Sequence, residues 1–109
     1  MTHKAFQRIA EQLLAELPAE VRAKLGRVAI LVEDDAPADD PYLMGQFIGV
    51  PYGEGDPAVP NRIVLYKNNI EDECEYEEDV PEEIRITLLH EIGHYLGLDE
   101  DDLADRGLQ

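Results

Sequence analysis

The pattern of apolar residues between Pro81 and Gly97 is the strongest constraint on how this chain folds. At about 100° per residue, one broad arc of a helix carries only apolar residues, namely Ile86, Leu88, Leu89, Ile92, Gly93 and Leu96. The opposite arc carries His90, Glu91 and His94. A helix patterned in this way is half buried. We therefore expect a long C-terminal helix whose histidines face a cleft.

Signals at both ends of this segment support the helix. Pro81 suits a first helical position, and Asp79 and Glu82 have the spacing of a capping box. Gly97 can adopt the left-handed conformation that ends a helix. Gly93 in the helix interior costs roughly 1 kcal/mol relative to Ala, which predicts that another backbone packs closely there.

The N-terminal segment predicts a second long helix and a short one. Its apolar residues recur at three- and four-residue steps, at Phe6, Ile9, Ala10, Leu13, Leu14 and Leu17. Thr2 is positioned as the N-cap, and Pro18 ends the helix. In the short helix that follows, Val21 and Leu25 share one face, and Gly26 provides the exit.

Three apolar runs between these helices predict strands. Val28 to Val32 is bounded by a glycine and an acidic cluster, which predicts a strand buried on both faces. Leu43 to Val50 is a weaker strand, and its glycines favour the edge of the sheet. Ile63 to Tyr66 is the third strand. We expect loops or short surface structure in the segments 34–41, 51–60 and 68–80.

The length of the chain limits these elements to one small fold. With 109 residues and no linker or repeat, residues 1–109 are expected to form a single domain. The fold class is α+β, with a small mixed β-sheet of three to four strands packed against an N-terminal helix and a C-terminal helix that carries the active site.

The net charge of the chain limits the classes of partner that it can bind. A formal net charge of -16, from 25 acidic and 9 basic residues, repels phosphate backbones and anionic membranes. We therefore expect no nucleic acid and no membrane as partners, and cationic peptides or metal ions instead. Without a signal core or a long apolar run, the expected location is cytoplasmic. Cys74, flanked by Glu73 and Glu75, is expected to be a structural thiol.

The polar arc of the C-terminal helix has the donor groups of a metal site. His90 and His94 fall within about 40° of each other and one turn apart, so both imidazoles can converge on one ion. Glu91 lies on the flank of this arc, where it can act as a general base without being a ligand.

A third ligand is expected after the glycine that ends the helix. A chain that turns at Gly97 can bring Glu100 back toward the metal, or Asp99 or Asp101 if the turn is one residue tighter or looser. Three protein ligands leave one position for water, as catalytic zinc requires. Two histidines and a carboxylate also suit iron, but this helix pattern favours Zn²⁺.

At these residues the chain resembles the zincin metallopeptidases, and more narrowly the small family of minimal zincins. His90, Glu91, His94, Gly97 and Glu100 fill the positions of the motif His-Glu-x-x-His-x-x-Gly-x-x-Asp/Glu. The likeness extends to further segments, namely 33–34, 43–45, 49–51, 62–66 and 87–89. It implies a reduced zincin-like fold. Metzincins, in contrast, have a third histidine where this chain has Glu100 and a methionine turn that this chain lacks.

The resemblance implies a zinc-dependent metalloendopeptidase-like hydrolase. In it, water activated by zinc attacks a peptide bond of a peptide or unfolded protein, with Glu91 as the catalytic base. The segment 43–50 is the expected edge for a substrate strand. Candidates for stabilising the oxyanion are Tyr66, Tyr95, Arg85 and His3. The alternatives are a non-catalytic zinc-dependent peptide-binding module and, against the charge of the chain, a metal-dependent ribonuclease.

Overall fold

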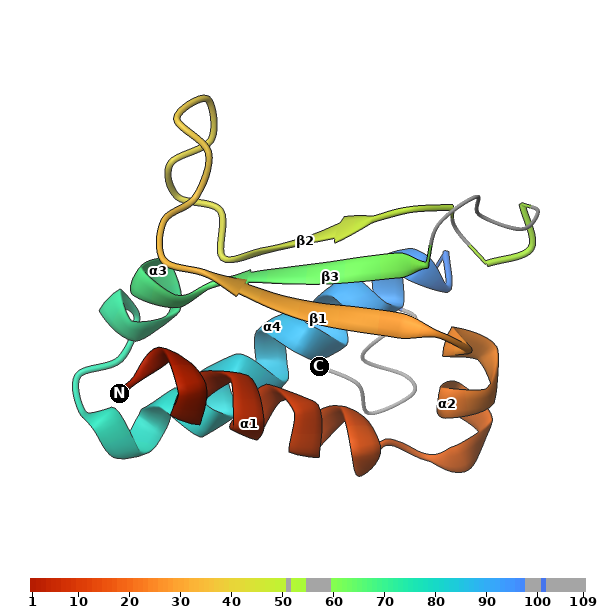
Figure 1. Ribbon diagram of the computed structural model, residues 1–109, viewed down its shortest axis with the longest axis horizontal. Coiled ribbons are helices and arrows are strands. Elements are labelled where there is room, and N and C mark those ends of the chain that lie inside the picture. The colour runs from red at the N-terminus through yellow and green to blue at the C-terminus, as the bar shows by residue number, and fades with distance from the viewer. Residues whose placement is uncertain (51, 55–59, 98–100, 102–109) are drawn as a thin grey trace.

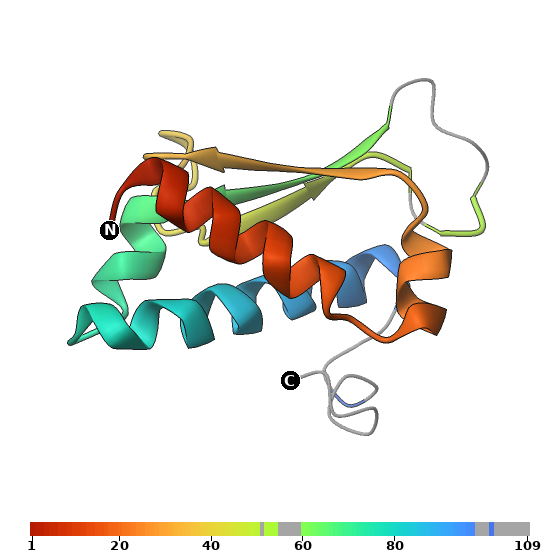
Figure 2. The ribbon, with the colours of Figure 1, turned by 60° about the horizontal axis from the view of Figure 1, so that its bottom comes forward.

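The protein is seen in a computed structural model that describes residues 1–50, 52–54, 60–97 and 101. Its elements, in chain order, are α1 (His3–Ala15), α2 (Ala19–Leu25), β1 (Val28–Glu33), β2 (Gly45–Ile48), β3 (Asn61–Tyr66), α3 (Lys67–Asp72), a 3₁₀ turn (Glu77–Asp79) and α4 (Val80–Tyr95). They form two layers, with the sheet on one side and α1 and α4 together on the other (Figures 1 and 2). This is the predicted α+β arrangement.

The sheet is small and mixed. Its strand order is β1-β3-β2, so the two strands that come first in the chain form the edges. β1 runs parallel to β3, with Ile30 opposite Ile63, and β2 runs antiparallel to β3, with Phe47 opposite the same residue. The prediction that the segment 43–50 contains an edge strand is confirmed.

The core lies between the two layers. Phe6 and Ala10 of α1 and Ile84, Leu88 and Ile92 of α4 are almost fully buried. The sheet contributes alternate residues to the same cluster, namely Ile30, Val32, Ile63 and Leu65. The apolar stripes predicted for the first and last helices therefore meet under the sheet.

The predicted start of α1 and the predicted end of α2 are confirmed, whereas α1 ends at Ala15, before the predicted stop at Pro18. The hydroxyl of Thr2 accepts a hydrogen bond from the amide of Ala5 at 3.1 Å, as an N-cap does. Gly26 ends α2 with φ at +58°, a conformation that side chains with a Cβ rarely adopt. These local signals depend on neighbouring residues alone.

Two expectations about local structure are wrong. β1 is not buried on both faces: Ala29 is exposed and Leu31 is 39% exposed, because the helices among the described residues cover only one side of the sheet. The capping box at the start of α4 does not form either. Asp79 has helical backbone angles and its side chain caps nothing, because the 3₁₀ turn runs directly into the helix.

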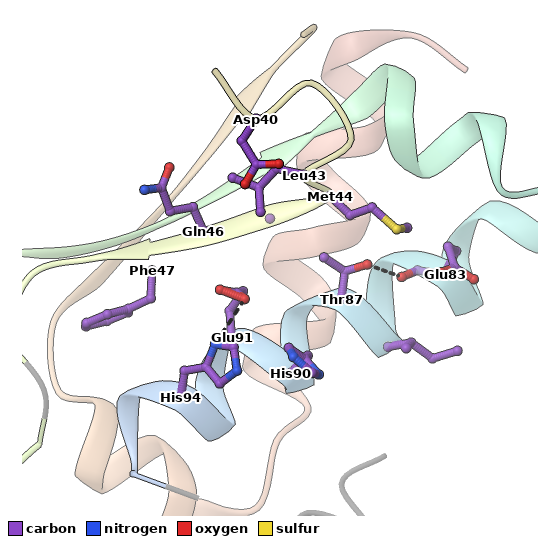
Figure 3. A pocket seen from close by; sticks show the side chains of 12 residues that line it. Asp40, Leu43, Met44, Gln46, Phe47, Glu83, Thr87, His90, Glu91 and His94 are labelled. Atoms are coloured by element: carbon purple, nitrogen blue, oxygen red, sulfur yellow. Dashed lines mark hydrogen bonds and ion pairs between the residues drawn. The ribbon is translucent and has the colours of Figure 1, made fainter. Parts of the chain in front are cut away.

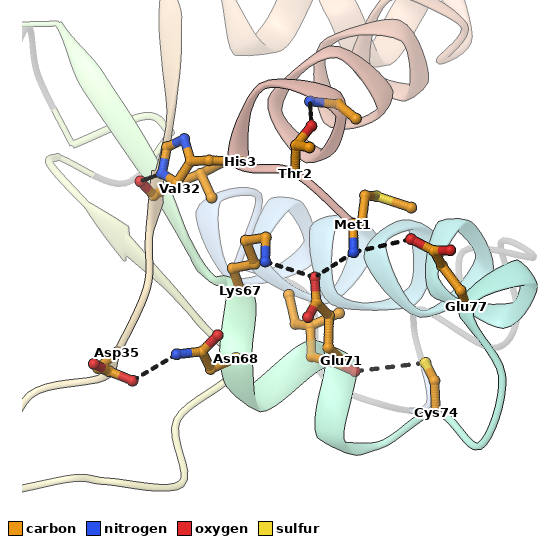
Figure 4. A network of polar contacts seen from close by, with 12 residues as sticks. Met1, Thr2, His3, Val32, Asp35, Lys67, Asn68, Glu71, Cys74 and Glu77 are labelled. Carbon is orange, nitrogen blue, oxygen red and sulfur yellow. Dashed lines mark hydrogen bonds and ion pairs between the residues drawn. The ribbon is translucent and has the colours of Figure 1, made fainter.

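Side chains from α1 bond two carbonyls at the outer edge of β1. His3 Nε2 donates to the carbonyl of Val32 at 2.7 Å, and Gln7 Nε2 donates to the carbonyl of Ile30 at 2.8 Å. Figure 4 shows the His3 contact beside the charged cluster of Lys67 and Glu71. Alternate carbonyls of a strand point to the same side. Both hydrogen bonds therefore satisfy carbonyl acceptors on the edge of β1 that faces away from β3.

Candidate metal centre

A cleft of about 730 Å³ lies between α4 and the edge strand β2. Its α4 wall consists of Glu83, Ile86, Thr87, His90, Glu91 and His94. The facing wall comes from β2 and the loop before it, through Asp40, Leu43, Met44, Gly45, Gln46 and Phe47. Figure 3 shows both sets of side chains around the same opening.

The two histidines of the motif lie side by side on the α4 wall. Their ring centroids are 4.5 Å apart and their planes are inclined at 75°. The side chain of His94 is 51% exposed, whereas that of Glu91 is only 9% exposed. Glu91 Oε2 lies 3.5 Å from His94 Nδ1 (Figure 3). The helix thus brings together the three residues that the sequence pattern singled out.

Glu91 is buried because β2 passes close to α4 at Gly45. A Cβ atom at Gly45 would lie 2.9 Å from Thr87 Cγ2 and 3.4 Å from Glu91 Cγ. Glu91 as a residue is 7% exposed, and Thr87 keeps its own hydroxyl satisfied by donating to the carbonyl of Glu83 at 2.9 Å. The missing side chain at Gly45 therefore sets how near the edge strand comes to the carboxylate.

The donor chemistry of this wall fits a zinc ion. Two imidazoles one helical turn apart offer nitrogen ligands, and a buried carboxylate stands beside His94 at the cleft. The expected third ligand, Glu100, and its alternative Asp99 lie outside the described residues. Asp101 is described and exposed. Within residues 1–50, 52–54, 60–97 and 101, no three His, Cys, Asp or Glu side chains gather as a metal-binding group.

Ile86 belongs to the cleft rather than to the core. The apolar arc of the helix was expected to pack inside throughout, yet Ile86 is 40% exposed and lines the opening one turn before His90. It stands at the margin of that arc, so the position of β2 decides which side it faces. Asp40 was also missed, since no local pattern links its loop to the helix, whereas Leu43 and Met44 lie in the segment expected to contact a substrate.

None of the four candidates for an oxyanion-stabilising group is among the described residues that line the cleft. Each makes another contact: Tyr95 donates to the carbonyl of Lys24, Tyr66 to Gln46, Arg85 to Glu82 and His3 to Val32. Burial raises the pKa of both tyrosines, so their hydroxyls stay protonated at neutral pH.

Cys74 lies away from this cleft. Its Sγ approaches the carbonyl of Ile70 at 3.5 Å. Burial, followed by the carboxylates of Glu83 and Asp79, raises the pKa of the thiol. A raised pKa disfavours the thiolate, which agrees with the structural role expected for this residue.

Comparison with known proteins places the chain in a family. A solved structure of a conserved hypothetical protein from Thermo thermophilus matches 96% of this chain and 99% of its own, at 26% identity and a TM-score of 0.61. No curated protein matches the chain. In the part of the chain that the structure describes, no helix has the length and hydropathy to cross a bilayer. Residues 25–108 match the sequence profile of zincin-like metallopeptidases, and the chain therefore belongs to the zincin-like metallopeptidase family.

Proposed function

We propose that this protein is a zinc-dependent metallopeptidase that hydrolyses peptide bonds in the cleft between α4 and β2. The observation that carries the proposal is the position of Glu91, whose buried carboxylate stands beside His94 and opens onto the cleft. Membership of the zincin-like metallopeptidase family supports the reaction class.

His90 and His94 would hold the zinc, together with Glu100, or with Asp99 or Asp101 in its place. Once bound, zinc supplies the Lewis acidity that activates a water molecule and polarises a peptide carbonyl. Glu91 takes the proton from the attacking water and passes it to the leaving amine. Its burial against β2 keeps the carboxylate in one position relative to both histidines.

The edge strand β2 provides a template for the substrate. Among the described residues it pairs with β3 on one side only, and its residues Gly45 to Phe47 line the cleft. A peptide or an unfolded segment in an extended conformation can add to this edge through main-chain hydrogen bonds. Such pairing places the peptide backbone along α4, opposite Glu91.

Elemental analysis and a cleavage assay on three proteins test the proposal. The wild type is expected to bind zinc and to cleave members of an unstructured peptide library. Glu91→Gln should retain zinc but lose turnover by at least about 10²-fold, since it keeps the shape of the side chain without the base. His90→Ala/His94→Ala should lose the metal.

Turnover retained in Glu91→Gln, or a wild type that takes up no zinc after incubation and dialysis, refutes the proposed mechanism. A wild type that holds zinc and binds peptides but never cleaves them is instead a zinc-dependent peptide-binding module. Circular dichroism of each variant distinguishes a lost site from a lost fold.

A further inference from the structure

We propose that the cleft selects peptides with a basic residue, Lys or Arg, whose cationic head is directed toward Asp40 and Glu83. This inference rests on the proposed function, because it names the substrate class of the same cleft. It goes beyond that function by assigning specificity to two residues that take no part in the chemistry.

The carboxylate side chains that line the cleft are not balanced by any described Lys or Arg. Besides Glu91, its charged lining residues are Asp40 and Glu83, and no described Lys or Arg lines it. Within the described residues, neither Asp40 nor Glu83 forms an ion pair with a basic side chain. Both carboxylates are thus available to a cation brought by the ligand.

The wall near these carboxylates is apolar. Met44 is half-buried and Ile86 is 40% exposed, and both line the cleft beside Leu43. In the view of Figure 3 the side chain of Met44 appears between those of Asp40 and Glu83, and all three residues line the cleft. The aliphatic stem of a Lys or Arg can pack on such a surface while its charged head stays in water near the carboxylates. A purely apolar side chain would pack on the apolar wall but would gain nothing from the carboxylates.

The loop that carries Asp40 is tied down before any ligand binds. Asn69 Nδ2 of α3 donates to the carbonyls of Pro41 at 2.9 Å and Leu43 at 2.7 Å. The amide of Leu43 donates in turn to the carbonyl of Asp40 at 3.3 Å. A carboxylate on a fixed backbone requires less ordering when the ligand binds, so more of its attraction appears as affinity.

A binding experiment that needs no turnover tests this inference. The inactive Glu91→Gln protein, supplied with zinc, is titrated with fluorescent peptides of one neutral scaffold that carry Lys, norleucine or Glu at each position in turn. At low salt we expect Lys at one position to bind about 10-fold more tightly than norleucine. The preference should nearly vanish at about 1 M salt, where charges are screened.

Two double variants of the Glu91→Gln protein test whether the preference for Lys depends on Asp40 and Glu83. Asp40→Asn/Glu83→Gln should bind Lys and norleucine peptides equally. Asp72→Asn/Glu78→Gln changes the net charge by the same amount at exposed side chains that do not line the cleft, and it should keep the preference. Equal binding of Lys and norleucine by the starting protein, no binding of any peptide, or an equal loss of preference in both double variants overturns the inference.

Cleavage by the wild type is measured separately on the same peptides. If Lys is preferred in binding but no peptide is cut, the proposed function fails and the assignment of the subsite stands. If peptides are cut in a Glu91-dependent way without preference for a basic residue, the function stands and the subsite assignment fails.

Discussion

Replacing Gly45 by Ala tests the packing that buries Glu91. The new methyl group would lie 2.9 Å from Thr87 Cγ2, 3.3 Å from the carbonyl oxygen of Val64 and 3.4 Å from Glu91 Cγ. The first distance is well inside van der Waals contact, so β2 or α4 must shift. The backbone of Gly45 has no positive φ, so the clash is the only obstacle to a side chain at this position.

The expected magnitude is the difference between two effects. Overpacking a well-packed site costs about 1–3 kcal/mol. Replacing Gly by Ala in a compatible conformation stabilises the folded protein by about 0.4–1 kcal/mol, because the unfolded chain has less conformational entropy. Gly45→Ala should therefore lower the free energy of unfolding by roughly 0.5–2 kcal/mol, or the melting temperature by several degrees.

A double-mutant cycle isolates the contact. Thr87→Ser removes the methyl group that the new Cβ would meet and keeps the hydroxyl that donates to Glu83. In urea denaturation followed by circular dichroism, Gly45→Ala should cost at least about 0.5 kcal/mol less in the Thr87→Ser background than in the wild type. An unchanged cost, or a Gly45→Ala protein as stable as the wild type, would refute the close approach of β2 to α4.

Two further predictions concern the loop and the sheet. Asn69→Ala removes the hydrogen bonds to Pro41 and Leu43 and should cost about 1–2 kcal/mol in urea denaturation; a change below about 0.3 kcal/mol would mean that the loop is not held there. Burial raises the pKa of Tyr66 above its ordinary value of 10.0. As pH rises above that value, Tyr66 ionises in the unfolded chain before it ionises in the folded protein, so the free energy of unfolding falls. The stability advantage of the wild type over Tyr66→Phe should shrink between about pH 9 and pH 11, and a constant difference would contradict the shift.

Features that depend on a few neighbouring residues could be predicted from the sequence. Thr2 caps the first helix, Gly26 ends the second with a positive φ, and Gly97 follows the last with φ at +74°. The spacing of His90 and His94 was enough to place both rings on one face, because helical geometry fixes their separation. Periodicity likewise identified the two apolar stripes that form the core.

Features that depend on distant parts of the chain could not be predicted in this way. Leu31 belongs to an uninterrupted apolar run, and only the absence of helices on that side of the sheet, among the described residues, leaves it 39% exposed. Ile86 turns toward the cleft because β2 lies on the far side of β3 from β1, an order that no local signal encodes. Asp40 reaches the site through a loop that is held by a hydrogen bond from Asn69 to the carbonyl of Pro41, 28 positions away in the sequence.

The bonded carbonyls at the β1 edge limit how copies of this chain can assemble. A flat sheet with two free edges can recruit strands on both sides and grow without end, which is the route to fibrils. Here the carbonyls of Ile30 and Val32 are already bonded to Gln7 and His3, so within the described residues β2 offers the freer edge. Two copies that paired through β2 would present outward edges whose carbonyls are already bonded, which disfavours growth beyond the dimer.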